Sequence, residues 1–392
     1  MTRGHGPGRT LARVRARLLP AAAAMTVLLA GCGPAGTDRG TAREPDPGRS
    51  PASAGAAPAE GSAEVVATVA RGLAAPWDMV QLPGGDLLVS LRDEGTIQHV
   101  DAGTGEVTLV GAVPGVSPGG EGGLLGLALE PDPGPRPALF VYATTAGDNR
   151  ISRFRYDPAA PPGERLGDGE TVLDGIPRGE ALHNGGGLAF GPDGMLYAAT
   201  GDTGARSQAQ DEESLAGKIL RLDPDGGPPP PGNPDPDSYV YSLGHRNVQG
   251  LAWDGSGQLW ATEFGEDTWD ELNRIEPGGN YGWPLHEGPG GQADGFTDPV
   301  LWWSPADASP SGLAYSQGSL WLAALRGERL WRVPLDGGAP AAEPQAFLHG
   351  EYGRLRSVLA PGGDELLVLT NETDSRGSPG AGDDRILRLR VS

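Results

Sequence analysis

A histidine beside three glycines is the residue best suited to proton transfer in this sequence. His183 is followed by Asn184 and by glycines at 185–187, directly before the apolar residues 188–190. These glycines supply no side chains to pack around an imidazole, and histidine readily gains and loses a proton near neutral pH. We therefore predict a general base at His183, with metal ligation or a plain turn as the alternatives.

Two further glycine-bounded loops carry groups that could bind a ligand rich in oxygen atoms. Residues 244–251, Gly-His-Arg-Asn-Val-Gln-Gly-Leu, are too polar for a strand interior, and Arg246 and Asn247 can bind the oxygens of a planar ligand directionally. Residues 120–126 place Glu121 among glycines that let a ligand approach the backbone closely. A corner that satisfies its own carbonyls, or a tight entry into a strand, would give the same patterns.

A third loop is strongly acidic. Residues 263–271 contain five carboxylates in nine positions, and residues 278–284, Gly-Gly-Asn-Tyr-Gly-Trp-Pro, follow shortly after. Carboxylates this close repel one another unless a cation compensates them, and ligands that are all oxygen favour Ca²⁺ over a transition metal. The spacing is not that of an EF-hand, and a solvated acidic loop is the alternative.

These loops interrupt a sequence that repeats itself. Six times a turn rich in glycine or proline leads into a short apolar strand, with spacings of roughly 45–65 residues, as in four-stranded propeller blades. The turns begin at Pro83, Pro131, Gly191, Asp254, Ser316 and Pro361. Hydrophobic period 2 dominates, and the one expected helix is short, over 211–216. We predict an all-β six-bladed β-propeller over 64–392, with an array of β-sandwiches as the alternative.

The overall charge limits the class of partner. The net charge is −21 over 392 residues, and it becomes −26 without residues 1–31, which contain five arginines and no acid. A protein that binds nucleic acid needs the opposite sign, so we expect no nucleic-acid partner. Most of the acidity is expected to be a solvated surface that repels copies of itself.

The N-terminal residues have the pattern of an export signal. An arginine-rich stretch precedes the apolar run 18–30, which is too short for a stable membrane span. The run ends in Leu-Ala-Gly-Cys at 29–32, which resembles the lipobox of bacterial lipoproteins and implies cleavage of 1–31 and acylation of Cys32. Residues 32–63 are expected to be a flexible tether. The expected location is therefore extracytoplasmic, with the lipid as the sole membrane anchor, and an ordinary secretory signal is the alternative.

Taken together, the motifs resemble the soluble quinoprotein glucose dehydrogenases, and most closely their aldose sugar dehydrogenase branch, the glucose/sorbosone dehydrogenase family. The resemblance spans about 65–389, nearly all of the expected folded part. It rests on the order of five motifs rather than on any one of them. The motifs lie at 121–126, 183–186, 244–251, 278–284 and 354–356.

The resemblance implies an enzyme that oxidises the C1 hydroxyl of an aldose to the lactone, with pyrroloquinoline quinone (PQQ) as hydride acceptor. His183 matches the general base of this family. Arg246 and Asn247 match the pair that contacts the quinone oxygens, and Arg246 stabilises the negative charge that develops. Glu121 falls where the family has Gln or Glu near cofactor and sugar.

The resemblance also implies how a polyanionic cofactor is held. PQQ carries three carboxylates, which an acidic protein repels unless basic residues and Ca²⁺ reverse the field locally. The matching basic positions are Arg326, Arg354 and Arg356. Gly265 and Glu266 match the backbone carbonyls that bind the cofactor calcium, and Glu271 and Tyr281 match a further calcium site.

Some positions depart from the family pattern. Gly187 replaces a longer polar side chain, which removes one expected contact to sugar or cofactor. Leu182 stands where glucose dehydrogenases proper have an acid, Ser357 replaces an acid, and Glu266 replaces a proline. We therefore expect cofactor binding without a defined preference for glucose. No segment after Trp283 resembles a dimer calcium loop, so we expect a monomer.

Two functions from other classes fit the same fold. A calcium-dependent lactonase would use carboxylate and amide ligands in the channel and would not need several arginines at its rim. A non-catalytic propeller that binds a sugar or a protein would not depend on His183. The sequence names neither the sugar nor the natural electron acceptor.

Overall fold

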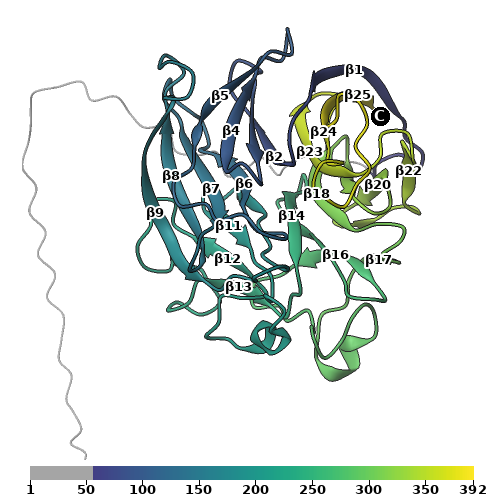
Figure 1. The fold of residues 1–392 in the computed structure, drawn as a ribbon. Helices are drawn as coiled ribbons and strands as arrows, with labels where there is room; N and C mark the ends of the chain where they lie inside the picture. Colours follow the sequence, from purple (N-terminus) through teal and green to yellow (C-terminus); the bar gives the residue numbers. More distant parts are fainter. Residues whose placement is uncertain (1–55) are drawn as a thin grey trace, which may run out of the picture. The chain divides into compact units, whose positions relative to one another are not determined.

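The computed structural model describes residues 56–392, and the predicted signal peptide, Cys32 and most of the predicted tether lie outside this range. The described residues form six small antiparallel sheets around a central channel (Figure 1). They contain 3-10 helices but no α-helix, and no helix long and apolar enough to span a bilayer. The prediction of an all-β six-bladed β-propeller is confirmed.

The first three blades follow one another along the chain. Blade 1 comprises β2 (Pro76–Gln81), β3 (Leu87–Leu91), β4 (Thr96–Val100) and β5 (Val107–Ala112). Blade 2 comprises β6 (Leu124–Leu129), β7 (Ala138–Thr144), β8 (Asn149–Tyr156) and β9 (Leu166–Ile176). Blade 3 comprises β10 (Leu188–Phe190), β11 (Leu196–Ala199), β12 (Lys218–Leu222) and β13 (Val240–Leu243), with the 3-10 helix η1 (Arg206–Gln210) before β12.

The remaining blades complete the ring. Blade 4 comprises β14 (Val248–Trp253), β15 (Leu259–Glu263), β16 (Asp270–Ile275) and β17 (Leu301–Trp303), with η2 (Gly291–Asp294) before β17. Blade 5 comprises β18 (Pro310–Ser316), β19 (Ser319–Ala324), β20 (Arg329–Asp336), β21 (Ala339–Pro340) and β22 (Gln345–Phe347). Blade 6 comprises β23 (Leu355–Gly362), β24 (Glu365–Thr370), β25 (Arg385–Val391) and β1 (Ala63–Arg71).

Each repeat found in the sequence is the first hairpin of a blade. The six turns join β2 to β3, β6 to β7, β10 to β11, β14 to β15, β18 to β19 and β23 to β24. The second strand of each blade, which follows the turn, is largely apolar because both of its faces are covered. The short helix expected over 211–216 is absent, because these residues form turns and the 3-10 turn of η1 ends at Gln210.

The N-terminal strand closes the ring, which the sequence did not reveal. β1 pairs antiparallel with β25 and so forms the outer strand of the C-terminal blade. Residues 57–62, which lie within the predicted tether, also pack on the propeller: the amide of Ala57 donates to the Leu335 carbonyl at 2.9 Å, and Arg332 donates to the Pro58 carbonyl at 2.9 Å. The ordered chain therefore begins before the predicted boundary at residue 64.

The hydrophobic core is divided into six layers, one between each pair of adjacent blades. The layer between blades 2 and 3 contains Phe140, Tyr142 and Leu220, and the layer between blades 5 and 6 contains Trp321 and Leu366. Because each layer depends on two neighbouring sheets, the blades stabilise one another around the ring.

The innermost strands approach one another too closely for most side chains. A Cβ at Gly187 would lie 2.6 Å from the Gln249 carbonyl oxygen, and a Cβ at Gly250 would lie 2.4 Å from the Ser311 carbonyl oxygen. Both distances are below any tolerable contact, so glycine is required there. The inner strands β2 and β23 instead carry Asp78 and Ser357 as their third residues.

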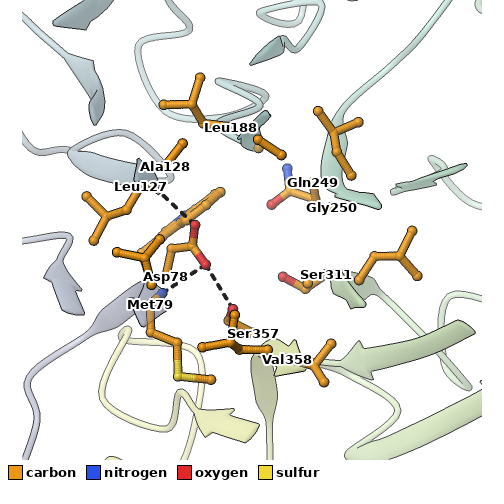
Figure 2. Close-up of a pocket in the computed structure, with 18 of the residues that line it drawn as sticks. Asp78, Met79, Leu127, Ala128, Leu188, Gln249, Gly250, Ser311, Ser357 and Val358 are labelled. Carbon is orange, nitrogen blue, oxygen red and sulfur yellow. Dashed lines mark hydrogen bonds between the residues drawn. The ribbon is translucent and has the colours of Figure 1, made fainter. Parts of the chain in front are cut away.

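Asp78 joins three blades inside the channel. Its carboxylate accepts hydrogen bonds from the Leu127 amide at 3.1 Å, the Met79 amide at 2.9 Å and the Ser357 hydroxyl at 2.9 Å (Figure 2). These donors belong to blades 2, 1 and 6. Burial raises the pKa of Asp78, although these donors and the charge of Arg356 oppose the shift. The side chain thus fastens the first blade to both of its neighbours.

Replacing Asp78 should destabilise the whole propeller. Asp78→Ala leaves the Leu127 amide and the Ser357 hydroxyl without an acceptor in a buried place, and we expect a loss of about 2–4 kcal/mol in the free energy of unfolding. Urea or thermal unfolding measures the change. Asp364→Ala, at an exposed turn, is the control and should change stability by less than about 0.5 kcal/mol. Equal stability of the two variants would contradict this role.

Candidate active site

Most of the site residues predicted from the sequence line one cavity of about 410 Å³ at the mouth of the channel. They come from the loops of several blades that meet at the same end of the ring. The cavity is lined by Glu121, His183, Arg246, Asn247, Gly265, Glu266, Arg326 and Arg354. Arg356 lines a smaller adjoining cavity that shares Glu121 and Arg354 with the first. The structure thus brings together residues up to 235 positions apart, counting from 121 to 356.

His183 is held by a buried carboxylate that sequence analysis missed. Its Nδ1 lies 2.6 Å from Asp202 Oδ1, and Asp202 Oδ2 accepts a hydrogen bond from Trp283 Nε1 at 2.8 Å. Burial acts to raise the pKa of Asp202, but the hydrogen bonds from these two rings and a backbone amide outweigh it and hold the pKa below its ordinary value. An ionised carboxylate can only accept, so Nδ1 carries the proton and Nε2 is the nitrogen left to act as a base.

The backbone of His183 is positioned as firmly as its ring. The residue has a φ of +57°, a conformation that few residues other than glycine adopt. Its amide donates to Glu121 Oε2 at 2.8 Å, and its carbonyl lies against Gly201, where a Cβ would come within 2.1 Å of the carbonyl oxygen. Two other segments of the chain, at residues 121 and 201–202, therefore position His183.

Glu121 and Asn247 bind protein groups around the histidine. Asn247 Nδ2 donates to Glu121 Oε2 at 3.3 Å, and Asn247 Oδ1 accepts from the Gly185 amide at 3.0 Å. Glu121 Oε1 forms an ion pair with Arg376 at 3.0 Å. Burial acts to raise the pKa of Glu121, yet the His183 amide and the Arg376 charge lower it overall. Asn247 thus fixes the loop of His183 in addition to lining the cavity.

Arg246 presents a guanidinium to the same cavity. The group lies 5.4 Å from the ring centre of Trp283, and its Nη1 donates to the Phe264 carbonyl at 3.2 Å. Its Nε is buried and has no hydrogen-bond partner among the described residues. A buried donor without an acceptor is costly, so this edge of the guanidinium is suited to an oxygen atom of a ligand.

The two arginines of the 354–356 motif differ in their surroundings. Arg354 forms an ion pair with Asp374 at 3.0 Å. Arg356 is fully buried, lies 3.8 Å from the ring centre of Trp77, and donates to Gln249 Oε1 at 2.9 Å. Burial, together with repulsion from Arg92, lowers the pKa of Arg356 to about 9. Arg326 is exposed at the rim.

The site therefore fits an anionic ligand. Among residues 56–392, neither Arg246 nor Arg356 forms an ion pair with a carboxylate, although both have buried atoms. A buried guanidinium without a counter-charge is unfavourable, and a ligand carboxylate or quinone oxygen would relieve that cost. The chemistry of this donor set matches a planar ligand with several carboxylates.

The predicted calcium ligands fall in two places. Gly265 and Glu266 line the large cavity, and the Glu266 side chain forms an ion pair with Arg206. Glu271 and Tyr281 meet at a separate cavity of about 10 Å³, which Glu263 and Glu287 also line. Within 56–392 no three His, Cys, Asp or Glu side chains form a metal-binding group, so a cation here would depend on backbone carbonyls as well.

The surroundings of the Glu271 carboxylate favour a cation at the cavity of about 10 Å³. Burial and the neighbouring charge of Glu263 raise the pKa of Glu271 to about 8. The Tyr281 hydroxyl is already engaged, since it donates to the Arg274 carbonyl at 2.6 Å and accepts from the Glu276 amide at 3.0 Å. Oxygen donors beside an uncompensated carboxylate are suited to Ca²⁺. The Tyr281 phenol oxygen is the least available member of the predicted set.

Comparison with known proteins agrees with this geometry. Residues 73–379 match the family described as "Glucose / Sorbosone dehydrogenase". The chain belongs to this family. It is 31% identical over 328 residues to the aldose sugar dehydrogenase YliI of Escherichia coli, covering 76% of this chain and 87% of that protein. It is 32% identical over 243 residues to quinoprotein glucose dehydrogenase B of Acinetobacter calcoaceticus, covering 53% and 50%.

A solved structure extends the similarity to three dimensions. The PQQ-bound form of aldose sugar dehydrogenase from Streptomyces coelicolor superposes with a TM-score of 0.84 and 61% identity, covering 86% of this chain and all of that one. The predicted family is confirmed, and so is the prediction that this member of the glucose/sorbosone dehydrogenase family is a sugar dehydrogenase of the quinoprotein class.

Two departures from the family pattern have structural explanations in this dehydrogenase. Gly187 is required by the approach of the Gln249 backbone, so a longer side chain has no room without a shift of the strand. Ser357 donates to Asp78 and thus serves the contact between blades 1 and 6. Leu182 is partly exposed beside His183. The expected loss of a ligand contact at residue 187 therefore follows from packing of the inner strands.

Asp202 should act as a positioning residue for His183. Asp202→Asn removes the acceptor that selects the Nδ1–H tautomer, and we expect turnover to fall about 10²–10⁴-fold with a much smaller change in KM. Steady-state kinetics with thermal unfolding separates this effect from instability. Asp174→Asn, at an exposed strand position, is the control. Unchanged turnover in Asp202→Asn would show that the carboxylate does not orient the base.

Proposed function

We propose that this protein oxidises the C1 hydroxyl of an aldose to the lactone, with PQQ as the bound electron acceptor and Ca²⁺ beside it. The observation that carries the proposal is the convergence of the Asp202-held imidazole of His183 with the guanidinium groups of Arg246 and Arg354 on one cavity. A general base beside a binding site for an anionic electron acceptor allows a proton and a hydride to be removed from the same alcohol.

The protein groups have distinct tasks in this reaction. His183 Nε2 accepts the proton of the C1 hydroxyl, and the Asp202 carboxylate stabilises the imidazolium that results. General-base assistance of this kind contributes roughly 10²–10⁴-fold to the rate. Arg246 faces the region where negative charge develops and stabilises it through its free Nε edge and its positive charge. Arg354 and Arg356 would hold the carboxylates of the cofactor.

The cofactor and the metal supply the remaining chemistry. When bound, the quinone accepts the two electrons of the alcohol as a hydride. Gly265 and Glu266 would offer backbone carbonyls to Ca²⁺ beside it, and Glu271 would contribute to a second calcium site. The names of the relatives support this assignment, because one is a quinoprotein and one was solved with PQQ bound.

An assay of aldose-dependent dye reduction tests the proposal. The purified protein loaded with PQQ and Ca²⁺ should reduce the dye, and His183→Ala should lose about 10²–10⁴-fold in turnover while it still binds PQQ. His349→Ala, an exposed histidine, is the control. Hydrolysis of a lactone without PQQ would favour a calcium-dependent lactonase, and the absence of both activities would favour a non-catalytic binding propeller.

We also propose that a lipid on Cys32 anchors the enzyme outside the cytoplasm. β18 begins at Pro310, next to the cavity residue Ser309, and Ala57 lies against Gly318 in the turn beyond the other end of that strand. The described part of the chain therefore begins at the face of the propeller opposite the cavity.

Replacement of Cys32 tests the anchor. Cys32→Ser removes the thiol that would be acylated, and we expect the protein to move from the membrane fraction to the soluble fraction. Fractionation and immunoblotting measure the distribution, and mass spectrometry of the wild-type N-terminal peptide measures the acyl group. Retention of Cys32→Ser in the membrane fraction would contradict lipid anchoring at this residue.

A further inference from the structure

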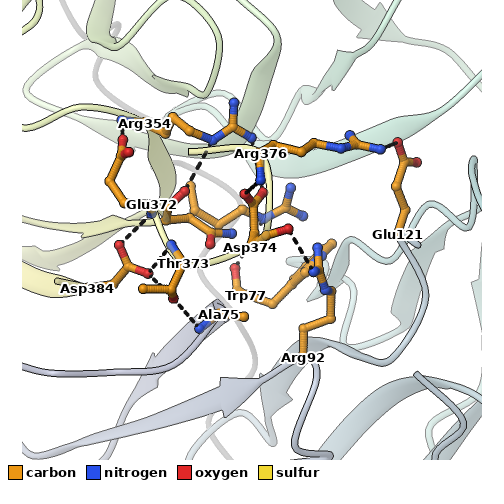
Figure 3. Close-up of polar contacts among 12 residues, drawn as sticks. Ala75, Trp77, Arg92, Glu121, Arg354, Glu372, Thr373, Asp374, Arg376 and Asp384 are labelled. Atoms are coloured by element: carbon orange, nitrogen blue, oxygen red, sulfur yellow. Dashed lines mark hydrogen bonds and ion pairs between the residues drawn. The ribbon is translucent and has the colours of Figure 1, made fainter. Parts of the chain in front are cut away.

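The loop between β24 and β25 holds an arginine that no sequence motif assigned to the site. Buried carboxylates fasten this loop: Asp384 accepts from the Glu372 amide at 2.6 Å and from the Thr373 amide at 3.1 Å (Figure 3). Asp374 accepts from the Arg376 amide at 2.9 Å. The backbone of Arg376 is thus fixed, and its side chain extends from the loop toward the cavity.

Arg376 crosses from blade 6 to the loop that precedes blade 2. Its Nη2 lies 3.0 Å from Glu121 Oε1, and both residues line the large cavity and the smaller one beside it (Figure 3). Arg354 and Arg92 come close to the same loop, since Arg354 pairs with Asp374 and Arg92 donates to the Asp374 carbonyl at 3.2 Å. The ion pair therefore lies among the groups that form the anion site.

Glu121 is an unfavourable residue for an anion site unless its charge is cancelled. Its side chain is only 20% exposed, and it accepts from the His183 amide and from Asn247 with its other oxygen. A carboxylate here repels any ligand carboxylate in the cavity, and burial alone would raise its pKa. Arg376 is the one cation that contacts Glu121 directly among residues 56–392.

We propose that Arg376 is the counter-charge of Glu121 and that this pair allows a polyanionic cofactor to bind beside a carboxylate. The inference rests on the proposed function, because it concerns the affinity for that cofactor. Arg376 acts through Glu121: it keeps the carboxylate ionised as the acceptor for the His183 amide while removing its repulsion from the cavity. The ligand class is a planar compound with several carboxylates, such as PQQ.

Direct binding measurements on four proteins test the coupling. The dissociation constant of PQQ, with Ca²⁺ present, is measured by calorimetry for the wild type, Arg376→Ala, Glu121→Gln and the double variant. We expect Arg376→Ala to bind about 3- to 10-fold more weakly, because the Arg376 side chain is 54% exposed and solvent screens part of its charge. Glu121→Gln leaves the Arg376 charge uncancelled and should bind PQQ more tightly than the wild type, whereas the double variant, which lacks both charges, should bind within about threefold of the wild type.

Unfolding of the same four proteins without cofactor gives a second readout. Arg376→Ala should lower Tm because it leaves the largely buried Glu121 carboxylate without its counter-charge. Adding Glu121→Gln in that background should restore most of the lost Tm. Arg390→Ala is the control, because it changes the net charge equally but removes an exposed ion pair with Asp364. It should alter neither PQQ binding nor Tm appreciably.

The outcomes separate this inference from the proposed function. Weak binding and low Tm in Arg376→Ala, both relieved by Glu121→Gln, support the inference. A double variant that binds PQQ as weakly as Arg376→Ala overturns it, because removal of the Glu121 charge would then relieve no repulsion. If the wild type does not bind PQQ, the proposed function fails. If Glu121→Gln does not restore the Tm that Arg376→Ala lowers, the coupling between the two residues is overturned.

Discussion

The guanidinium of Arg356 lies fully buried over the ring of Trp77, with neutral hydrogen-bond partners and no carboxylate in contact among the described residues. A charge in such a place is stable only if the surrounding fold holds it firmly and if something negative can approach it. The rest of the site follows from this constraint. In a chain of net charge −21, the mouth of the channel is a local region of positive charge.

The ring of blades is what makes that region possible. Loops from the blades meet at the same end of the channel, so residues distant in sequence become neighbours. The inner strands approach closely at glycines such as Gly250, and Asp78 closes the inner ring where glycine is absent. Stability of the ring and precision of the site are therefore coupled, because a shift of one blade would move its loop relative to all the others.

The carboxylates of the site divide into two kinds. Asp202 and Glu121 are hydrogen-bonded as ions, and protein donors lower the pKa of each despite burial. Glu271 and Asp270 have raised pKa values, about 8 and about 6, because burial exceeds the hydrogen bonds that they receive. The first kind positions the histidine and its loop, and the second kind lies where a divalent cation would supply the missing compensation.

Local patterns in the amino-acid sequence were enough to predict the class of fold and most of the predicted residues that line the cavity. Six turns followed by apolar strands indicate six blades, and motifs such as His183-Asn-Gly-Gly and Gly-His-Arg-Asn-Val-Gln-Gly mark the loops that carry chemistry. Three contacts were not foreseeable in this way: the pairing of β1 with β25 that closes the ring, the contact of Asp202 with His183, and the ion pair of Arg376 with Glu121. Each of these is a contact between segments far apart in sequence, and it exists because the circular packing of sheets, rather than any local signal, sets which loops face one another.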